Sequence, residues 1–227
     1  MIKSGILINI CLVLCFSLAS KAQNYRDSLH VVSLKQYILQ TKATPEKALV
    51  EIDKVVLGIK LDIRYATTNN FMHQQMYTQA RAFARLPLTN ALKAVEADLK
   101  IKGLGLKIFD AYRPYTITEK FYALASDKNF VANPKKGSQH NRGCAVDITL
   151  IDLSTGKELD MPTPFDSFSA KAAANYVALP PRVIQNREML KTVMQNHGFK
   201  MLENEWWHFD FIGWQKFEIL DIPFNKL

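Results

Sequence analysis

Apolar residues recur along the chain with two different spacings, and these spacings predict its secondary structure. Leu88, Leu92 and Leu99 repeat at helical intervals, which favours an amphipathic helix with one buried face. Pro87 suits the first turn of such a helix and Gly103 suits a position beyond its end. We therefore expect a helix between these two residues.

Strand patterns occupy other parts of the sequence. The segment 55–65, VVLGIKLDIRY, alternates well enough for one or two strands, and 104–110 and 206–211 are short apolar or aromatic runs of strand type. Residues 144–151 also have high strand propensity. Because side chains alternate across a strand, Val146, Ile148 and Leu150 would share one face, and Ala145, Asp147 and Thr149 the other.

Two further helices are expected between these strands. Thr116 and Glu119 have the spacing of a capping box, which predicts a helix over 117–126. A second helix is predicted over 186–197, ended by Gly198. Helices and strands mix without a regular βαβ rhythm, and neither repeats nor a Gly/Ser linker divide the chain. The pattern predicts a single α+β domain.

The first 22 residues have the features of a cleaved signal peptide. Lys3 precedes an apolar run from Ile6 to Ala19, and small residues surround a cleavage point after Ala22. This run is too short to span a bilayer comfortably. We therefore expect an exported, periplasmic protein with a signal peptide (1–22), a polar, weakly structured arm (23–48) and a catalytic domain (49–227). No transmembrane segment is expected after signal removal.

The net charge limits the binding partners to be expected, and the cysteine content limits the possible disulfides. The formal net charge is +8, which suits a solvated surface or attraction to an anionic cell envelope. The sequence has no lysine and arginine run, so nucleic acid is not an expected partner. After signal removal Cys144 is the last cysteine, which excludes an intramolecular disulfide.

The segment SQHNRGCAVD (138–147) contains two candidate metal ligands. His140 would offer an imidazole nitrogen from a turn, Gly143 would let the chain bend, and Asp147 would offer a carboxylate from the following strand. Zn²⁺ takes both kinds of ligand. A histidine and an aspartate at this spacing also arise by chance. The alternative to a metal site is therefore structural: a histidine in a turn, and a strand aspartate that pairs with an arginine.

The segment ENEWWHF (203–209) supplies a third candidate ligand and a base. With His208 as the third ligand, a catalytic zinc would keep one position open for water. Glu205 could then take a proton from that water. Positions three apart on a regular strand face opposite ways, so Glu205 must precede the strand or lie at a bulge. At least one of Trp206 and Trp207 is expected in the core.

The segment DAYRP (110–114) contributes a candidate for transition-state stabilisation. Arg113 carries a permanent charge and can donate two parallel hydrogen bonds to an oxyanion. The structural alternative is an ordinary ion pair between Asp110 and Arg113.

Together these segments resemble the VanX-type D-alanyl-D-alanine dipeptidases, zinc peptidases that cleave free D-Ala-D-Ala. The resemblance runs from Leu49 to Phe224 and also rests on DIRYATTNNF (62–71), FD (165–166) and QNREML (185–190). It implies a small α+β domain, in which a central antiparallel sheet lines a zinc cleft and helices pack around it. The ligands of one Zn²⁺ would be His140, Asp147 and His208, with Glu205 as general base and Arg113 steadying the transition state.

The resemblance also implies a pocket for the free amino end of the dipeptide. Tyr65, Ser138 and Asp166 match its residues, and a buried ammonium needs such a compensating acid. The expected substrate is a small D-amino-acid dipeptide. The alternative is a zinc carboxypeptidase or endopeptidase that acts on longer peptidoglycan stem peptides.

Two more distant hypotheses use the same ligands. Fe(II) oxygenases also bind metal through two histidines and one carboxylate, but usually place the carboxylate two residues after the first histidine, where this chain has a gap of seven. A metal-stabilised binding module without catalysis is the other hypothesis. It is disfavoured because Glu205 and Arg113 would have no role in it, since neither residue is needed to hold zinc. No role is assigned to His30, His73 or His197, and Cys144 is expected to be a small strand residue, not a nucleophile.

Overall fold

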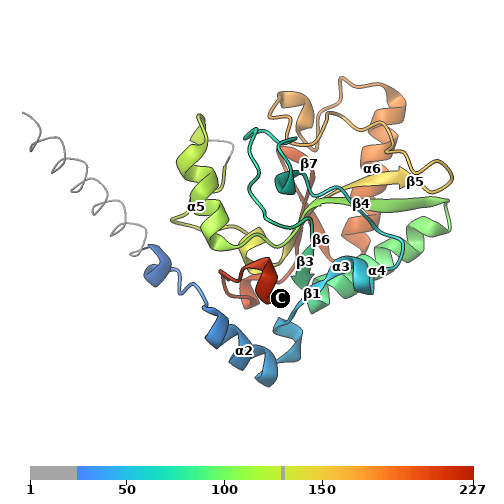
Figure 1. The fold of residues 1–227 in the computed structure, drawn as a ribbon. Coiled ribbons are helices and arrows are strands. Elements are labelled where there is room, and N and C mark those ends of the chain that lie inside the picture. The colour runs from blue at the N-terminus through green and yellow to red at the C-terminus, as the bar shows by residue number, and fades with distance from the viewer. Residues whose placement is uncertain (1–24, 129–130) are drawn as a thin grey trace, which may run out of the picture.

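A computed structural model of the protein describes residues 25–128 and 131–227. Within this part of the chain, helices and strands are intermixed in one α+β architecture, as expected (Figure 1). The predicted signal peptide (1–22) lies outside the described residues. The exported location stays a prediction.

A five-stranded sheet forms the centre of the domain. Its order is β2-β4-β5-β7-β6, and every neighbouring pair is antiparallel except β2 with β4. A second, two-stranded sheet pairs β1 with β3. The strands are β1 (Leu49–Glu51), β2 (Lys60–Leu61), β3 (Phe83–Arg85), β4 (Leu104–Asp110), β5 (Ala145–Asp152), β6 (Phe199–Leu202) and β7 (Glu205–Phe211).

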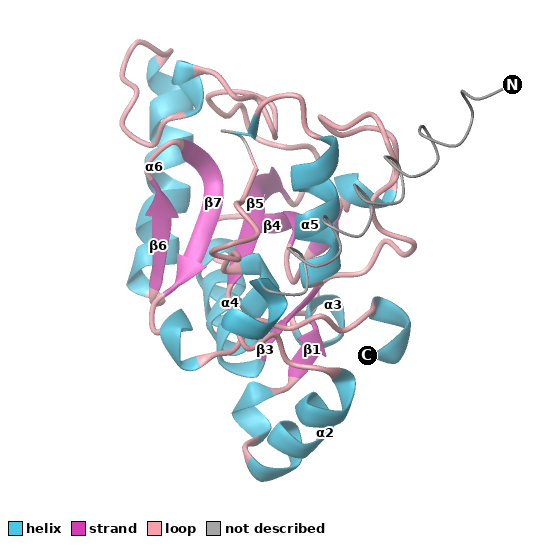
Figure 2. Ribbon diagram, turned by 90° about the vertical axis from the view of Figure 1, so that its left-hand side faces the viewer, coloured by secondary structure: helices cyan, strands magenta, loops and turns pink. Residues whose placement is uncertain are grey.

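The described helices are α2 (Leu34–Ala43), α3 (Ile52–Val55), α4 (Leu86–Lys100), α5 (Tyr115–Leu124) and α6 (Pro181–Asn196). Short 3-10 turns lie at Pro45–Lys47, Arg64–Ala66, His140–Arg142, Ala170–Ala172, Trp214–Lys216 and Phe224–Lys226. Helices α4 and α6 contact each other and the sheet, and α5 lies apart from them across the sheet (Figure 2).

The strongest sequence patterns are confirmed. The predicted helix after Pro87 is α4, whose Leu88, Leu92 and Leu99 are buried. The predicted strands 104–110, 144–151 and 206–211 are β4, β5 and β7, and the predicted helix 186–197 forms the larger part of α6. Helix α6 begins earlier, at Pro181, since proline fits a first turn.

The segment 55–65 contains one strand, β2, which agrees with the expectation of one or two, and Gly58, at φ +100°, lies between the preceding helical turn and this strand. Two local predictions are wrong. The arm predicted to be weakly structured contains α2, which has a complete capping box between Ser33 and Gln36. Helix α5 begins at Tyr115, and the Thr116 hydroxyl donates to Asp221 Oδ2 at 2.6 Å instead of capping the helix.

Arg85 ties three segments of the fold together. It is fully buried, and its guanidinium donates to the backbone carbonyls of Lys47, Arg142 and Glu218. These carbonyls belong to the chain before β1, the turn that carries His140 and the C-terminal segment. Because buried carbonyls need donors, Arg85 stabilises the turn next to the candidate site.

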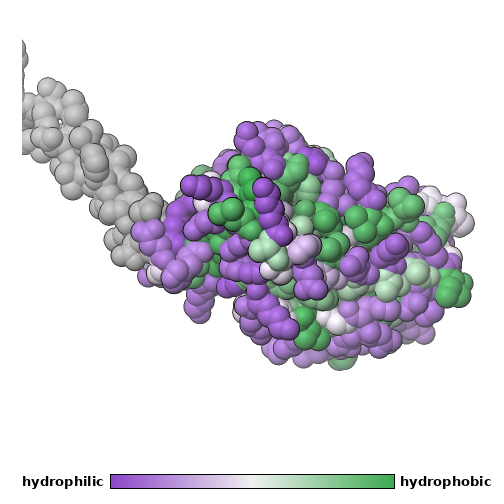
Figure 3. All heavy atoms as spheres, turned by 90° about the horizontal axis from the view of Figure 1, so that it is seen from below, coloured by the Kyte–Doolittle hydropathy of each residue, from purple (hydrophilic) through white to green (hydrophobic). Residues whose placement is uncertain are grey.

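The surface seen from below mixes hydrophilic and hydrophobic side chains (Figure 3). Residues 25–128 and 131–227 include no helix with both the length and the apolarity to cross a bilayer.

Gly143 connects the His140 turn to β5 in a conformation that disfavours other residues. It has φ +67°, and a Cβ there would lie 2.5 Å from Leu49 Cδ2. Replacing it with alanine adds about 1–2 kcal/mol of backbone strain and about 1–3 kcal/mol of overpacking. We predict that Gly143→Ala lowers the melting temperature by roughly 2–4 °C per kcal/mol lost.

Gly156→Ala is the matched control. Gly156 has φ +69°, but a Cβ there meets no atom within 4 Å, so this variant experiences the backbone strain alone. Calorimetric melting of both variants should show the larger decrease for Gly143→Ala. Equal decreases would contradict the proposed clash with Leu49.

Candidate functional site

Three neighbouring strands place a row of polar side chains across the middle of the sheet. Asp110 on β4 lies opposite Asp147 on β5, and Asp147 lies opposite His208 on β7. All three are buried. Because directly opposite residues share a face of the sheet, the pairing brings the Asp147 carboxylate and the His208 imidazole together.

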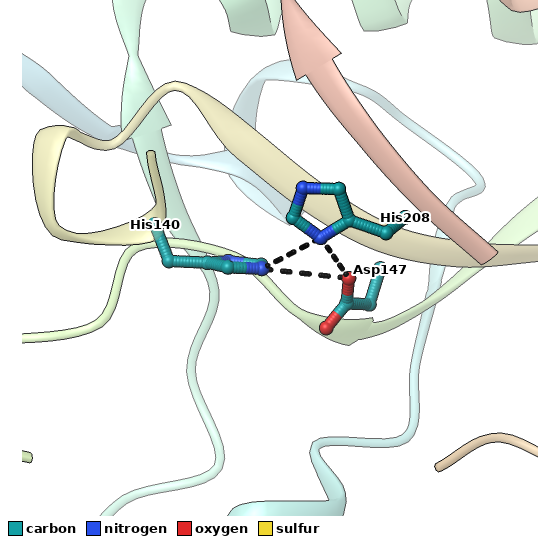
Figure 4. A group of neighbouring side chains, drawn as sticks. All are labelled: His140, Asp147 and His208. Carbon is teal, nitrogen blue, oxygen red and sulfur yellow. Dashed lines mark hydrogen bonds and ion pairs between the residues drawn. The ribbon is translucent and has the colours of Figure 1, made fainter. Parts of the chain in front are cut away.

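His140 joins this row from the turn His140–Arg142. Its Nε2 lies 3.2 Å from His208 Nδ1 and 3.4 Å from Asp147 Oδ1, and His208 Nδ1 lies 3.0 Å from that same oxygen (Figure 4). Tetrahedral ligands at about 2.0–2.2 Å from a Zn²⁺ ion are about 3.3–3.6 Å apart. The three predicted ligands therefore converge as a group that could hold a metal ion.

Hydrogen bonds on the far side of each ring set which nitrogen faces the cluster. His140 Nδ1 lies 2.7 Å from the Ala111 carbonyl oxygen, which can only accept, so Nδ1 carries the hydrogen and Nε2 offers its lone pair. His208 Nε2 lies 2.9 Å from Asp210 Oδ1, which leaves Nδ1 as the inward atom. Metal-binding histidines usually have such partners.

The cluster is strongly polarised. Burial alone would raise the pKa of Asp147, but the charges and hydrogen bonds of His140 and His208 hold it well below its usual range. Burial alone would lower the pKa of His208, but its hydrogen bonds to Asp147 and Asp210 raise it to about 10. The buried Asp147 carboxylate is therefore stabilised by positive charge beside it, and a metal cation bound to the two imidazoles would supply that charge.

Glu205 lies beside the cluster because β7 is irregular at this point. The partner of Met201 on β6 is Phe209, whereas the partner of the next residue, Leu202, is Glu205. Of the two alternatives expected from the spacing of Glu205 and His208, this shift is the bulge, and Glu205 Oε2 lies 4.0 Å from His208 Nδ1. Burial raises the pKa of the Glu205 carboxyl, and Asp147 raises it further.

Arg113 is held by an ion pair and two aromatic rings. Its Nη2 and Nε donate to Asp110 Oδ2 at 2.7 and 3.2 Å, while the guanidinium carbon lies 5.3 Å from the centre of the Tyr65 ring and 4.8 Å from that of Phe121. Asp110 also accepts a hydrogen bond from the Tyr77 hydroxyl. The ion pair expected as the structural alternative is present, and Arg113 nevertheless lines the cleft.

Tyr65 and Asp166 form a second polar group in the same cleft. The Tyr65 hydroxyl donates to Asp166 Oδ1 at 3.1 Å, whereas the buried Oδ2 has no protein hydrogen-bond partner. Burial and the charge of Asp147 raise the pKa of Asp166 well above its usual range. Asp166 also has φ +59°, a conformation that aspartate tolerates better than most residues.

One cleft of about 290 Å³ contains all eight predicted site residues, which are Tyr65, Arg113, Ser138, His140, Asp147, Asp166, Glu205 and His208. Ser138 differs from the others in its hydrogen bonding, because its hydroxyl accepts from the His140 backbone N–H at 3.0 Å. It therefore also positions the His140 turn.

Sequence reasoning missed Asp210 and Tyr77. Asp210 lies two positions after His208, on the same face of β7, so strand alternation could have indicated it. Tyr77 comes from an irregular loop, and no sequence signal places it beside Asp110. Both Trp206 and Trp207 are buried, and burial raises the pKa of the Cys144 thiol to about 12, which does not suit a nucleophile.

The Asp210 contact predicts a measurable effect on metal affinity. Removing a carboxylate that orients a metal-binding histidine costs about 10–100-fold in affinity. We expect Asp210→Ala to weaken zinc binding by this factor in competition with a chromogenic chelator. Asp98→Ala is the matched control, because it removes a comparable contact of 2.8 Å to His197 outside the cleft. Equal affinities for Asp210→Ala and the unmodified protein would contradict the role of Asp210.

Comparison with solved structures gives distant similarities. The LdcB LD-carboxypeptidase aligns at a TM-score of 0.38 and 22% identity, over 59% of this chain and 61% of its own. VanYB in complex with D-Alanine-D-Alanine aligns at a TM-score of 0.37 and 14% identity, over 60% of this chain and 75% of its own. These TM-scores are too low to bear on the site.

Sequence comparison gives a closer relationship. The D-alanyl-D-alanine dipeptidase of Escherichia coli (strain K12) is 32% identical over 162 residues, which cover 71% of this chain and 83% of the relative. The enzyme of the same name from Enterococcus faecium is 30% identical over 183 residues, which cover 70% and 88%. The profile of the D-ala-D-ala dipeptidase family matches residues 45–224. The chain therefore belongs to this family of peptidases and is a hydrolase, as its resemblance to the family implied.

Proposed function

We propose that the protein is a zinc-dependent dipeptidase that hydrolyses D-Ala-D-Ala, with Glu205 as the general base. The observation that supports this most strongly is the convergence of His140, Asp147 and His208 in a cleft that Glu205 and Arg113 also line. The family membership and the names of the relatives support the substrate.

The donor set suits zinc as the metal. Two imidazole nitrogens and one carboxylate oxygen leave a fourth tetrahedral position free, which is the pattern of catalytic zinc sites. Zinc would supply a Lewis acid and a water molecule of lowered pKa. Iron can use the same donor types, so metal analysis of protein purified without added metal distinguishes zinc from an iron oxygenase.

The remaining groups have complementary roles in hydrolysis. Glu205 takes a proton from the attacking water as its oxygen bonds to the peptide carbonyl carbon. Arg113 donates to the carbonyl oxygen as negative charge develops on it. Asp110 accepts hydrogen bonds from Nε and Nη2, and the guanidinium has five N–H donors in all. When the C–N bond breaks, Glu205 passes the proton to the leaving amine.

Asp166 and Tyr65 would select the amino end of the dipeptide. The Asp166 Oδ2 that has no protein partner can accept a hydrogen bond from a substrate ammonium. A cation there would also stabilise the ionised form of a carboxyl whose pKa is otherwise raised by burial. Ser138 lines the same cleft and is included in the proposed pocket.

The second candidate keeps this chemistry and changes the substrate to a longer peptidoglycan stem peptide. The predicted export favours it, because a periplasmic enzyme would meet such peptides directly. The buried Asp166 carboxyl favours the dipeptide, because a longer peptide would place no ammonium beside it.

The first test is an assay of D-Ala-D-Ala cleavage with and without a chelator. We expect cleavage that is lost on zinc removal and returns when zinc is added. Glu205→Gln should lower kcat by about 100-fold or more while the bound zinc per chain stays within about twofold. Cleavage that persists in the chelator, or its absence from the zinc-loaded protein, would contradict the proposal.

Asp166→Asn separates the two substrate classes. Asparagine tolerates the positive φ and can still accept the Tyr65 hydrogen bond, so this variant removes little except the charge. Loss of a buried charge partner costs about 2–5 kcal/mol, and we expect kcat/KM for D-Ala-D-Ala to fall by roughly 30-fold or more. Unchanged kcat/KM, measured by release of D-alanine, would favour the longer peptide.

A further inference from the structure

A second cavity lies beside the proposed dipeptide site. Its volume is about 360 Å³, and its lining includes Met72 and Gln74 from the loop after β2, and residues 124–127 at and after the end of α5. This lining combines apolar side chains with polar ones and with the carboxylate of Asp127. None of the proposed catalytic, metal-binding or substrate-binding residues belongs to it.

Two phenylalanine rings separate the two cavities. Among the described residues, only Phe71 and Phe168 line both the catalytic cleft and the outer cavity. Their ring centres lie 5.1 Å apart with an angle of 87° between the planes, which is a favourable edge-to-face contact. The Phe71–Phe168 pair therefore forms a wall shared by both spaces.

The wall stands at the end of the cleft that would hold the substrate's amino group. Phe168 follows Asp166 by two positions, and the Phe71 ring meets Tyr65 edge-on, with 6.2 Å between the ring centres. Tyr65 in turn donates to Asp166. A substituent on the amino nitrogen of a dipeptide in this cleft would therefore point towards the wall.

Phe168 is the residue of the wall to shorten. Phe71 stacks on Phe121 of α5 at 5.7 Å between ring centres and also meets the ring of Tyr65, which belongs to the proposed amino-end pocket. Shortening Phe71 would therefore disturb that pocket directly. Phe168 comes from the irregular segment between β5 and α6 and contacts Phe71 across the wall.

We propose that the Phe71–Phe168 pair restricts this enzyme to dipeptides with a free amino end, and that the outer cavity accepts an N-acyl group when the wall is opened. The inference rests on the proposed dipeptidase function. The cleft itself, at about 290 Å³, is at the lower limit of the roughly 300–1,000 Å³ of small-molecule sites, so the wall leaves little room for an extension.

The test compares D-Ala-D-Ala with N-acetyl-D-Ala-D-Ala in the zinc-loaded protein. The unmodified enzyme should prefer the free dipeptide. In Phe168→Ala, the ratio of kcat/KM for the acetylated peptide over the free one should rise at least about tenfold. A ratio is used because it cancels any general loss of activity, and circular dichroism checks folding. If Phe168→Ala does not fold, Phe168→Leu replaces it and should raise the ratio about threefold.

Leu124→Ala is the matched control. Leu124 lines the outer cavity but not the cleft, so this variant enlarges the outer space and leaves the wall intact. Its ratio should stay within about twofold of the unmodified enzyme. The proposal is overturned if the folded Phe168 variant shows no change, if Leu124→Ala gives an equal rise, or if the unmodified enzyme already cleaves both peptides equally.

Calorimetric measurement of the binding of both peptides distinguishes a failure of the wall proposal from a failure of the proposed dipeptidase function. In the zinc-loaded Glu205→Gln background, Phe168→Ala should bind N-acetyl-D-Ala-D-Ala at least about tenfold more tightly than the variant with Phe168 intact. If the unmodified enzyme cleaves neither peptide, the dipeptidase function fails, and a gain in binding still supports the wall. No gain in binding overturns the wall whether or not D-Ala-D-Ala is cleaved.

Discussion

The antiparallel pairing of β5 with β7 is the constraint on which the candidate site depends. It places Asp147 directly opposite His208 in the middle of the sheet, where strands on both sides fix their positions. A shift of this register by one residue would turn one of the two side chains to the other face. The chain after β4 then fixes His140, because the Ala111 carbonyl accepts from its ring and the Arg113 backbone N–H donates to its carbonyl.

The same central strands connect metal binding to the rest of the proposed chemistry. The bulge in β7 turns Glu205 towards the cluster, and Asp110, in the same row of the sheet, holds Arg113. A buried ion pair such as Asp110 with Arg113 contributes little net stability, so we interpret it as positioning the guanidinium. The proposed amino-end pocket (Tyr65 and Asp166) and the Phe71–Phe168 wall come instead from segments outside the strands. Substitutions there can change substrate preference without disturbing the sheet.

The sequence predicted the elements with strong patterns and the residues within compact motifs. Helix α4 and strands β4, β5 and β7 follow from hydrophobic spacing and strand geometry alone. The bulge near Glu205 was one of two alternatives, and it was expected only if Glu205 and His208 act at the same metal. The assignment of His140, Asp147 and His208 to one cluster needed the family resemblance, because sequence spacing cannot show which strands become neighbours. Tyr77 and the Phe71–Phe168 contact depend on how loops pack over the sheet. Helix α2 was missed because its mostly polar sequence resembles that of an unstructured arm, although the spacing of Ser33 and Gln36 is that of a capping box.

The central claim is that one zinc ion binds His140, Asp147 and His208 together, and anomalous diffraction at the zinc absorption edge tests it most directly. Crystals of the zinc-loaded protein should give a single strong peak in the cleft, about 2.0–2.2 Å from His140 Nε2, an Asp147 carboxylate oxygen and His208 Nδ1. A peak bound by other residues, or three side chains too far apart to share one ion, would contradict the account.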